Sequence, residues 1–171
     1  DALPISADAP GAPGPARPTL DGGARYRAGL GLPGHQLGPD DALVTIVVWS
    51  DYACRFCARL WPVIAAVRGA HPDDVRVIVR HLATPAHRGA QLAAEAAVAA
   101  AAQGQLAAFH AAVLAAGGPL DRGALEAHAA AVGLDVRAVA AALADRRYRD
   151  AVLADTAAGE ALGVDGTPTV L

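Results

Sequence analysis

The stretch VTIVVWSDYACRFC, residues 44–57, decides the fold of this 171-residue chain. Residues 43–49 form a continuous apolar run rich in β-branched side chains, which predicts a strand buried on both faces. Two cysteines, Cys54 and Cys57, follow shortly after the run. From residue 54 to about residue 70 the apolar side chains recur at helical spacing. The cysteine pair is therefore expected at the point where a buried strand passes into a helix.

The segment after this helix completes a βαβ unit. Residues 75–82 (VRVIVRHL) alternate apolar and polar side chains, as a second strand would. A strand, a helix and a strand in close succession predict that the two strands pair in parallel.

Residues 86–162 change to alanine-rich helical character and predict a helical insertion. We expect helices over residues 87–102 and 104–116, then two helices capped by Asp121 and Asp135, and a last helix that ends near Leu162. The chain then returns to a loop and a β-prone end.

The first residues have a different composition. Residues 1–24 are rich in proline, alanine and glycine and contain few large apolar side chains, which predicts a disordered or extended linker. It serves as a tether to an upstream membrane anchor or leader, or it has no role, and both interpretations stay open. A short edge strand is expected at residues 26–32.

Composition and charge exclude some classes of function. The chain has 14 basic and 17 acidic residues, for a net charge of −3, and the basic residues are scattered arginines. This pattern argues against a nucleic-acid partner. No apolar run reaches the length of a membrane span, and no leader is visible. Two cysteines so close together must act locally, which is typical of a redox or metal site.

The cysteines at the start of a helix indicate redox chemistry. Unpaired N–H groups and the positive end of the helix dipole favour a thiolate there, so Cys54 is expected to be the nucleophile. Cys57, one turn further on, is expected to be the resolving thiol. Arg55 and Arg59 place positive charge where the dipole disfavours it, by a few tenths to about 1 kcal/mol each. We expect Arg55 and its neighbour Phe56 to tune the thiolate, and Arg59 to face solvent.

Residues 44–57 resemble the signature of the DsbA-like branch of the thioredoxin superfamily. Pro62 lies where thioredoxin-like proteins often carry a proline in the active-site helix, and residues 77–82 resemble the strand that follows it. Residues 163–169 (GVDGTPT) closely resemble the cis-proline loop of the family. The resemblance covers residues 26–171 and is carried by two motifs far apart in the chain.

The resemblance implies an α/β, thioredoxin-like fold. Its N-terminal part would occupy residues 25–85, with the CxxC pair in a βαβ unit. The helical insertion would occupy residues 86–162, and residues 163–171 would form the cis-proline loop and the start of the next strand. The hairpin and final helix that follow this loop in the family are expected to be missing from this chain.

The resemblance also implies roles for Thr167 and Pro168. A cis bond before proline costs only about 0.5–1 kcal/mol relative to trans. It would turn the backbone of Thr167 toward the cysteines, where it would pair with an extended substrate. The implied activity is thiol–disulfide exchange on protein substrates with a redox partner protein, without a cofactor, a metal or a nucleic acid. The implied location is bacterial and extracytoplasmic, either periplasmic or tethered to a membrane.

Several points stay open. Strongly oxidising members usually carry a proline and a histidine between the cysteines, so Arg55-Phe56 leaves the direction of electron flow undecided among oxidase, reductase and isomerase. The oligomeric state is not predicted. A metal site on the two cysteines lacks a second ligand pair. A redox-inactive binding or regulatory domain of a larger protein is the main alternative.

Other polar residues near the motif are interpreted as structural. Asp51, three residues before Cys54, is expected to accept hydrogen bonds at the start of the helix. His81 and His110 are expected to be capped or half-buried structural residues. His35 and the other three histidines are expected in turns or on helix surfaces.

Overall fold

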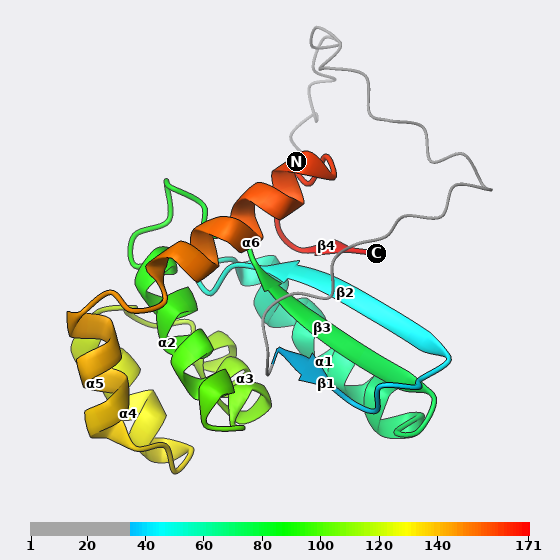
Figure 1. Cartoon of the computed structure of the whole chain (residues 1–171), viewed down its shortest axis with the longest axis horizontal. Helices are drawn as coiled ribbons and strands as arrows, with labels where there is room; N and C mark the ends of the chain where they lie inside the picture. The colour runs from blue at the N-terminus through cyan, green and yellow to red at the C-terminus, as the bar shows by residue number, and fades with distance from the viewer. Residues whose placement is uncertain (1–34) are drawn as a thin grey trace, which may run out of the picture.

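The computed structural model describes residues 35–171, which form a mixed four-stranded sheet and six helices (Figure 1). The strands are β1 (Gln36–Leu37), β2 (Val44–Ser50), β3 (Val75–His81) and β4 (Thr169–Val170). The helices are α1 (Arg55–Ala70), α2 (Ala90–Ala102), α3 (Leu106–Ala116), α4 (Arg122–Ala131), α5 (Val136–Ala144) and α6 (Arg149–Ala161). The strand order across the sheet is β1-β3-β2-β4.

The centre of the sheet is the βαβ unit predicted from the sequence. Strands β2 and β3 pair in parallel along their whole length, from Val44 opposite Val75 to Ser50 opposite His81, and α1 connects them. The short strands β1 and β4 add antiparallel edges to β3 and β2 respectively. Because β2 and β3 are the inner strands, most of their apolar side chains are buried where the sheet is covered.

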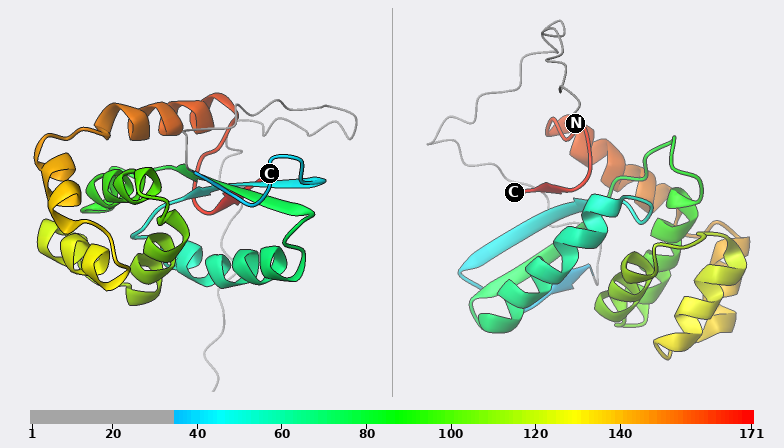
Figure 2. Two further views of the ribbon diagram at one scale, coloured as in Figure 1. Left: turned by 60° about the horizontal axis from the view of Figure 1, so that its bottom comes forward. Right: turned by 180° about the vertical axis from the view of Figure 1, so that it is seen from behind.

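Helices cover the sheet on both faces, so that the fold has three layers (Figure 2). On one face, side chains of β2 and β3 pack against α1 and the insertion: Val48, Val77, Val79, Trp61 and Ile64 belong to this core. On the other face a smaller cluster lies beneath α6 and contains Val47, Trp49, Ile78, Leu82 and Val164. Successive side chains of a strand point to opposite faces of the sheet, so the inner strands contribute to a separate core on each face.

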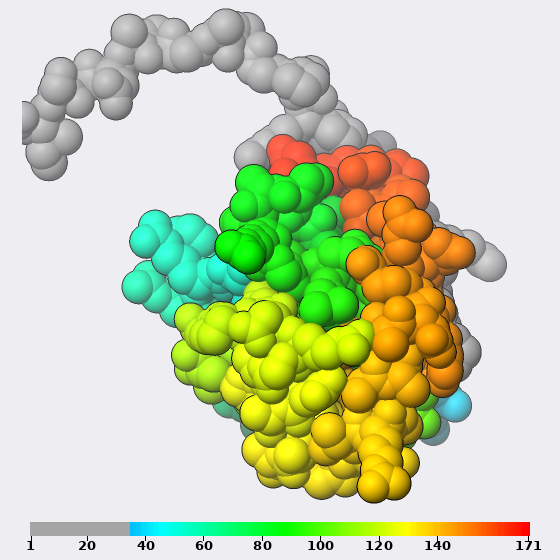
Figure 3. Space-filling view, turned by 90° about the vertical axis from the view of Figure 1, so that its left-hand side faces the viewer, coloured from blue at the N-terminus to red at the C-terminus, as the bar shows by residue number. Residues whose placement is uncertain are grey.

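The helical insertion comprises α2 to α6. Helices α2 to α5 lie at one end of the sheet, and α6 runs back across one of its faces (Figures 1 and 2). In the side view of Figure 3, the helices drawn in yellow-green to orange form a continuous surface. Ten of the thirteen residues of α2 are buried, most of them alanine. A helix that is buried on all sides needs small side chains so that its neighbours can approach closely, which explains the alanine-rich composition.

One buried acid in α2 ties the insertion together. The carboxylate of Glu95, which is fully buried, accepts two hydrogen bonds from the Arg146 guanidinium at 2.9 and 2.7 Å. Arg146 lies in the turn between α5 and α6 and has a positive φ of 52°. This bidentate pair is the strong geometry for an arginine–carboxylate contact, and it raises the pKa of Arg146.

The structure confirms the predicted caps. Asp121 and Asp135 accept hydrogen bonds from the N–H groups of Ala124 and Ala138 at 3.0 and 3.1 Å. The predicted start of α2 is wrong, because left-handed Gly89 (φ 81°) ends a turn just before Ala90.

Other differences fall near the N-terminus and at α3. The start of α3 lies two residues later than predicted, after left-handed Gly104. Strand β1 was not predicted at all. The linker expected at residues 1–24 and the strand expected at residues 26–32 lie outside the described residues. Within residues 35–171, no helix is both long enough and apolar enough to cross a bilayer.

Gly159 in α6 lies tightly against Trp49 of β2, and an alanine there should destabilise the fold. A Cβ at this position would lie 2.6 Å from Nε1 of Trp49, which is 1% exposed. We expect Gly159→Ala to lower the free energy of unfolding by about 1–3 kcal/mol, as overpacking does. The matched control is Gly69→Ala in α1, where a Cβ meets no atom within 4 Å and a gain of about 0.5–1 kcal/mol is expected. Urea unfolding measures both, and equal effects would contradict this account.

Candidate active site

Cys54 is the N-cap of α1, with extended backbone angles (φ −83°, ψ 114°). Its carbonyl accepts the first helical hydrogen bond, from the N–H of Ala58 at 3.2 Å. In the described structure no side chain caps this end of α1, so the sulfur itself faces the first N–H groups. The predicted placement of Cys54 where a strand passes into a helix is confirmed.

The loop at Thr167 and Pro168 lies directly against Cys54. The Thr167–Pro168 peptide bond is cis, as expected from the motif. The Cys54 thiol donates a hydrogen bond to the Thr167 carbonyl at 3.3 Å, although the two residues are 113 positions apart. Antiparallel pairing of Thr169 with Trp49 carries the loop to this position. The two motifs of the sequence therefore meet at one site.

The surroundings of Cys54 favour its thiolate. Burial alone would raise the pKa of this thiol, which is 8% exposed. Hydrogen bonds from the backbone of Cys57, the side chains of Thr167 and Cys57, and the backbone of Phe56 outweigh burial, and the pKa is lowered. The helix N-terminus supplies both backbone donors, so local structure stabilises the negative charge.

Cys57 lies in the opposite environment. It is 2% exposed, and burial raises the pKa of its thiol to about 11. Hydrogen bonds from the N–H of Asp51 (3.5 Å) and from the Ser50 and Thr167 side chains oppose this effect, whereas the nearby Cys54 adds to it. Both thiols are free in the structure. The site therefore joins one readily ionised thiol to one that stays protonated near neutral pH.

Two side chains at this site were not found from the sequence. The hydroxyls of Ser50 and Thr167 both act on the cysteine sulfurs. Only the backbone of Thr167 was expected to matter, and Ser50 was not singled out. The one available signal for Ser50 was its position as a polar residue that ends an apolar strand.

The side chain of Asp51 holds the active-site loop, and only its backbone N–H contacts a cysteine. Its buried carboxylate accepts hydrogen bonds from the N–H groups of Ala53 (2.8 Å) and Thr84 (3.0 Å). It also lies 2.8 Å from Nδ1 of His87. The predicted role at the start of the helix is confirmed, and the same carboxylate joins this loop to the segment after β3.

Arg55 and Phe56 form the outer rim of the motif. The Arg55 guanidinium lies 4.7 Å from the centroid of the Phe56 ring, a cation–π contact, and Phe56 is 50% exposed. Thiolate tuning by these two residues stays a prediction. Arg59 is exposed, as expected.

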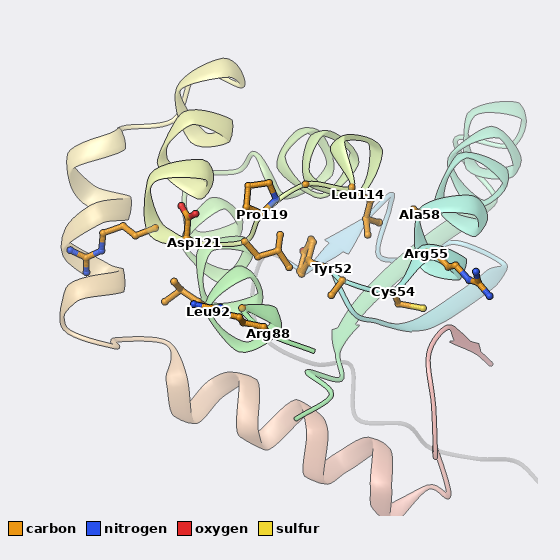
Figure 4. A pocket seen from close by; sticks show the side chains of 15 residues that line it. Tyr52, Cys54, Arg55, Ala58, Arg88, Leu92, Leu114, Pro119 and Asp121 are labelled. Carbon is orange, nitrogen blue, oxygen red and sulfur yellow. The ribbon is translucent and has the colours of Figure 1, made fainter. Parts of the chain in front are cut away.

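A groove of about 780 Å³ opens beside Cys54 (Figure 4). The active-site loop, the start of α2 and the connection between α3 and α4 line it. Its lining residues are Tyr52, Ala53, Cys54, Arg55, Ala58, Arg88, Gly89, Leu92, Leu114, Gly117, Gly118, Pro119, Leu120, Asp121 and Arg122. This groove was not predicted from the sequence, because it forms only when the insertion packs against the cysteine motif.

A second set of buried polar groups lies at the end of β3. The rings of His35 and His81 are 4.9 Å apart and perpendicular, and all four ring nitrogens lack a hydrogen-bond partner among residues 35–171. A third buried histidine, His110 of α3, has its Nδ1 2.7 Å from the Tyr52 hydroxyl. His81 and His110 are structural, as expected, but fully rather than half buried. The expectation of a turn or surface position for His35 is wrong, because β1 carries it against the buried end of β3.

Three ligand-type atoms of His35, His81 and Asp155 come within 4.8 Å of one another. However, the Asp155 carboxylate already contacts Arg80 Nε at 2.8 Å and accepts the N–H of His81 at 3.1 Å. The arginine charge opposes a metal cation at this position. The cluster is better described as a buried ion pair beside two neutral imidazoles.

The buried histidines should make the protein sensitive to acid. Burial, with the Arg80 charge, lowers the pKa of His35 from 6.5 to about 4. Burial, with the His35 charge, lowers that of His110 to about 3, and the pKa of His81 also lies well below its ordinary value. Between pH 6.5 and 4 the unfolded chain therefore binds protons that the folded chain does not. The free energy of unfolding therefore decreases as the pH is lowered through this range, by up to about 1.4 kcal/mol per pH unit for each histidine.

Asp155 acts in the opposite direction, because burial raises its pKa to about 6 despite Arg80, but three histidines outweigh one carboxyl. Urea unfolding at stepped pH values measures the net slope. We expect His110→Gln to reduce the slope and His71→Gln, an exposed control, to leave it unchanged. If the parent protein and both variants show the same change in the free energy of unfolding per pH unit, the buried histidines are not the source of the acid sensitivity.

The fold and the cysteine pair define the class of protein: a thioredoxin-fold oxidoreductase with a helical insertion. The family model described as thioredoxin (Thioredoxin_4) matches residues 32–171. The chain therefore belongs to this DsbA-like family.

Solved structures agree with this assignment. A thioredoxin-like oxidoreductase from Silicibacter pomeroyi is 29% identical, with a TM-score of 0.71 over 80% of this chain and 78% of that chain. BdbD from Bacillus subtilis, at 22% identity, shares the fold with a TM-score of 0.72 over 82% of this chain and 84% of that one.

Sequence relatives include much longer proteins. The Na(+)/H(+) antiporter NhaA 3 from Salinispora tropica is 39% identical over 138 residues, which are 79% of this chain and 21% of the antiporter. NhaA from Herminiimonas arsenicoxydans is 36% identical over 135 residues, again 21% of its length. The chain thus spans about a fifth of the length of these relatives.

Proposed function

We propose that the chain catalyses thiol–disulfide exchange on protein substrates through Cys54 and Cys57. One observation carries the proposal: Cys54 has a lowered pKa at the start of α1, whereas Cys57 has a pKa raised to about 11. The thiolate is the attacking species in exchange, so the lowered pKa makes the outer cysteine the more readily attacking thiol of the two. Cys57, the inner cysteine, stays protonated during the first attack and reacts only in the second step.

The exchange has two balanced steps. The Cys54 thiolate attacks one sulfur of a substrate disulfide, that S–S bond breaks, and the other substrate sulfur leaves as a thiolate that takes up a proton. Cys57 then loses its proton to solvent and attacks the Cys54 sulfur. The mixed disulfide breaks and a Cys54–Cys57 disulfide forms. The substrate has gained the two electrons that the protein lost, and the same steps in reverse oxidise a substrate dithiol.

The cis-proline loop supplies the substrate contact in this proposal. The Thr167 carbonyl already lies within hydrogen-bond distance of Cys54. An extended substrate that pairs with the backbone of Thr167, with Pro168 beside it, would bring its sulfur to the same place. Backbone pairing tolerates many sequences, as exchange on varied proteins requires. Arg55 and Phe56, at the rim, would adjust the thiolate.

We further propose an extracytoplasmic location, either periplasmic or as part of a larger membrane protein, with a separate redox partner protein. The relatives support this: two are membrane antiporters, and a periplasmic thioredoxin-like protein from Salmonella enterica shares the fold.

The test compares ionisation with exchange. The ultraviolet absorbance of thiolate in the reduced protein is followed against pH, and the protein is then equilibrated with mixtures of reduced and oxidised glutathione. We expect one thiol to ionise well below its ordinary pKa and a reversible Cys54–Cys57 disulfide to form. Two ordinary thiol pKa values, together with no catalysis of insulin reduction or of thiol oxidation, would favour a redox-inactive binding domain instead.

A further inference from the structure

The groove beside Cys54 lies where three helices begin. Its lining includes the first residues of α1 and α4, Arg55 and Arg122, and the two residues that precede α2, Arg88 and Gly89. Figure 4 shows Arg88 and Leu92 from the α2 segment across from Cys54 and Arg55 of the active-site segment, with Pro119 and Asp121 completing the lining. Each helix start carries the positive end of a helix dipole. Three such ends therefore converge on one open space.

The side chains increase this positive charge. The first turns of α1, α2 and α4 contain no acidic residue in the described structure. Arginines begin α1 and α4 instead, although cations at a helix start cost a few tenths to about 1 kcal/mol each, and Arg88 lies two residues before α2. The lining contains three arginines and one aspartate, in a chain whose net charge is −3. The local rule is thus broken at two helix starts around one groove, with Arg88 as a third positive charge, and this is what a binding site for negative charge produces.

The charges are also available to a ligand. Arg88 is exposed and forms no ion pair within the part of the chain that the structure describes. Arg122 is exposed and lies 4.0 Å from the half-buried Glu126, a long contact that contributes little. The only lining carboxylate, that of Asp121, accepts the N–H of Ala124 and so caps α4. One carboxylate against three guanidinium groups leaves the groove with an excess of positive charge.

The remaining lining suits a peptide. Leu92, Leu114 and Leu120 give apolar surface between the charged positions. A volume of about 780 Å³ is within the range of sites that take a compact ligand of several groups, roughly 300–1,000 Å³. Because Cys54 itself lines the groove, whatever occupies it lies beside the reacting sulfur.

We propose that this groove binds the segment that flanks the reactive cysteine of the substrate, and that it selects acidic segments. The proposal rests on the exchange activity proposed above and names its substrate class. Carboxylates of the substrate bind Arg88 and Arg122, while neighbouring apolar side chains rest on the leucines. The attacked sulfur then lies at Cys54, between the groove and the Thr167 carbonyl.

Two peptides test the proposal. They share one sequence with a single cysteine, flanked by glutamates in one and by lysines in the other, and each carries a chromogenic aromatic thiol as a mixed disulfide. We expect the acidic peptide to react about tenfold faster or more at low ionic strength, and the difference to shrink as salt is added. The uncharged 2-hydroxyethyl disulfide serves as the reference for exchange itself.

Two variants locate the effect. Arg88→Glu should reduce the ratio of the two peptide rates to one or below. Arg59→Glu changes an equally exposed arginine of α1 that does not line the groove, and it should keep the ratio. Equal rates for the two peptides, or equal effects of the two variants, would overturn the groove proposal while exchange with 2-hydroxyethyl disulfide still stands. No reaction with that small disulfide would instead overturn the exchange activity.

Discussion

Cys54→Ser is expected to abolish thiol–disulfide exchange, with a rate loss of roughly a thousandfold or more, whereas Cys57→Ser is expected to trap mixed disulfides. The reason is the asymmetry of the two thiols. A serine at position 54 provides no thiolate, although the helix start that lowers the pKa of Cys54 is intact. A serine at position 57 leaves the first attack possible and removes the sulfur that would release the substrate.

Mass spectrometry of the intact protein checks both halves of this prediction. After incubation with a disulfide-bonded substrate, Cys57→Ser should carry the mass of one substrate thiol, and Cys54→Ser should carry none. Because Cys57 is 2% exposed and its pKa is about 11, it should not replace Cys54 as the attacking thiol. If the two variants form adducts equally, the assignment of nucleophile and resolving thiol is wrong.

Asp155→Ala should be the most destabilising single change among the buried polar residues discussed above. The carboxylate is 2% exposed, lies 2.8 Å from Arg80 Nε and accepts the N–H of His81 at 3.1 Å. Removing it takes away the carboxylate that faces the Arg80 guanidinium, which is 8% exposed, and the acceptor of the His81 N–H. The expected loss in the free energy of unfolding is about 3–5 kcal/mol, the cost of breaking a buried pair from one side.

The chain offers a matched control in a second aspartate–arginine pair. Asp145 lies 3.4 Å from Arg147, but the two side chains are 65% and 52% exposed. Asp145→Ala should therefore change the free energy of unfolding by less than about 1 kcal/mol. Both variants are compared by urea unfolding at pH 8, above the raised pKa of Asp155 of about 6, so that the carboxylate is charged in the parent protein. A small, similar effect of both changes would show that the buried pair adds little.

The parts of the fold that were predictable are those coded by local pattern. The apolar run of β2 and the helical spacing in α1 determine the βαβ unit from neighbouring residues alone. The caps of α4 and α5 followed from Asp121 and Asp135, since a cap depends on a side chain three residues from its partner. The meeting of Cys54 with Thr167 was predictable only through family resemblance, because no local rule joins residues so far apart.

What was missed depends on packing between distant segments. Strand β1 has only two residues, and it forms because the edge of β3 is there to pair with it. The burial of His35 follows from that pairing. The groove exists because the α3–α4 connection lies against the cysteine motif. In each case the residues could be read from the sequence, but their structure depends on contacts with a segment far away in the chain.

The start of α1, which no other side chain caps, affects how readily a Cys54–Cys57 disulfide is reduced. As a thiolate, Cys54 supplies the charge that the first N–H groups of the helix face; as half of a disulfide, it supplies none. A thermodynamic cycle connects the two oxidation states with the folded and unfolded chains. Suppose that the helix start makes the free energy of folding more favourable for the reduced chain than for the oxidised chain. The same free-energy difference must then make reduction of the disulfide more favourable in the folded protein than in the unfolded chain. The backbone of one helical turn thus acts as a determinant of electron affinity.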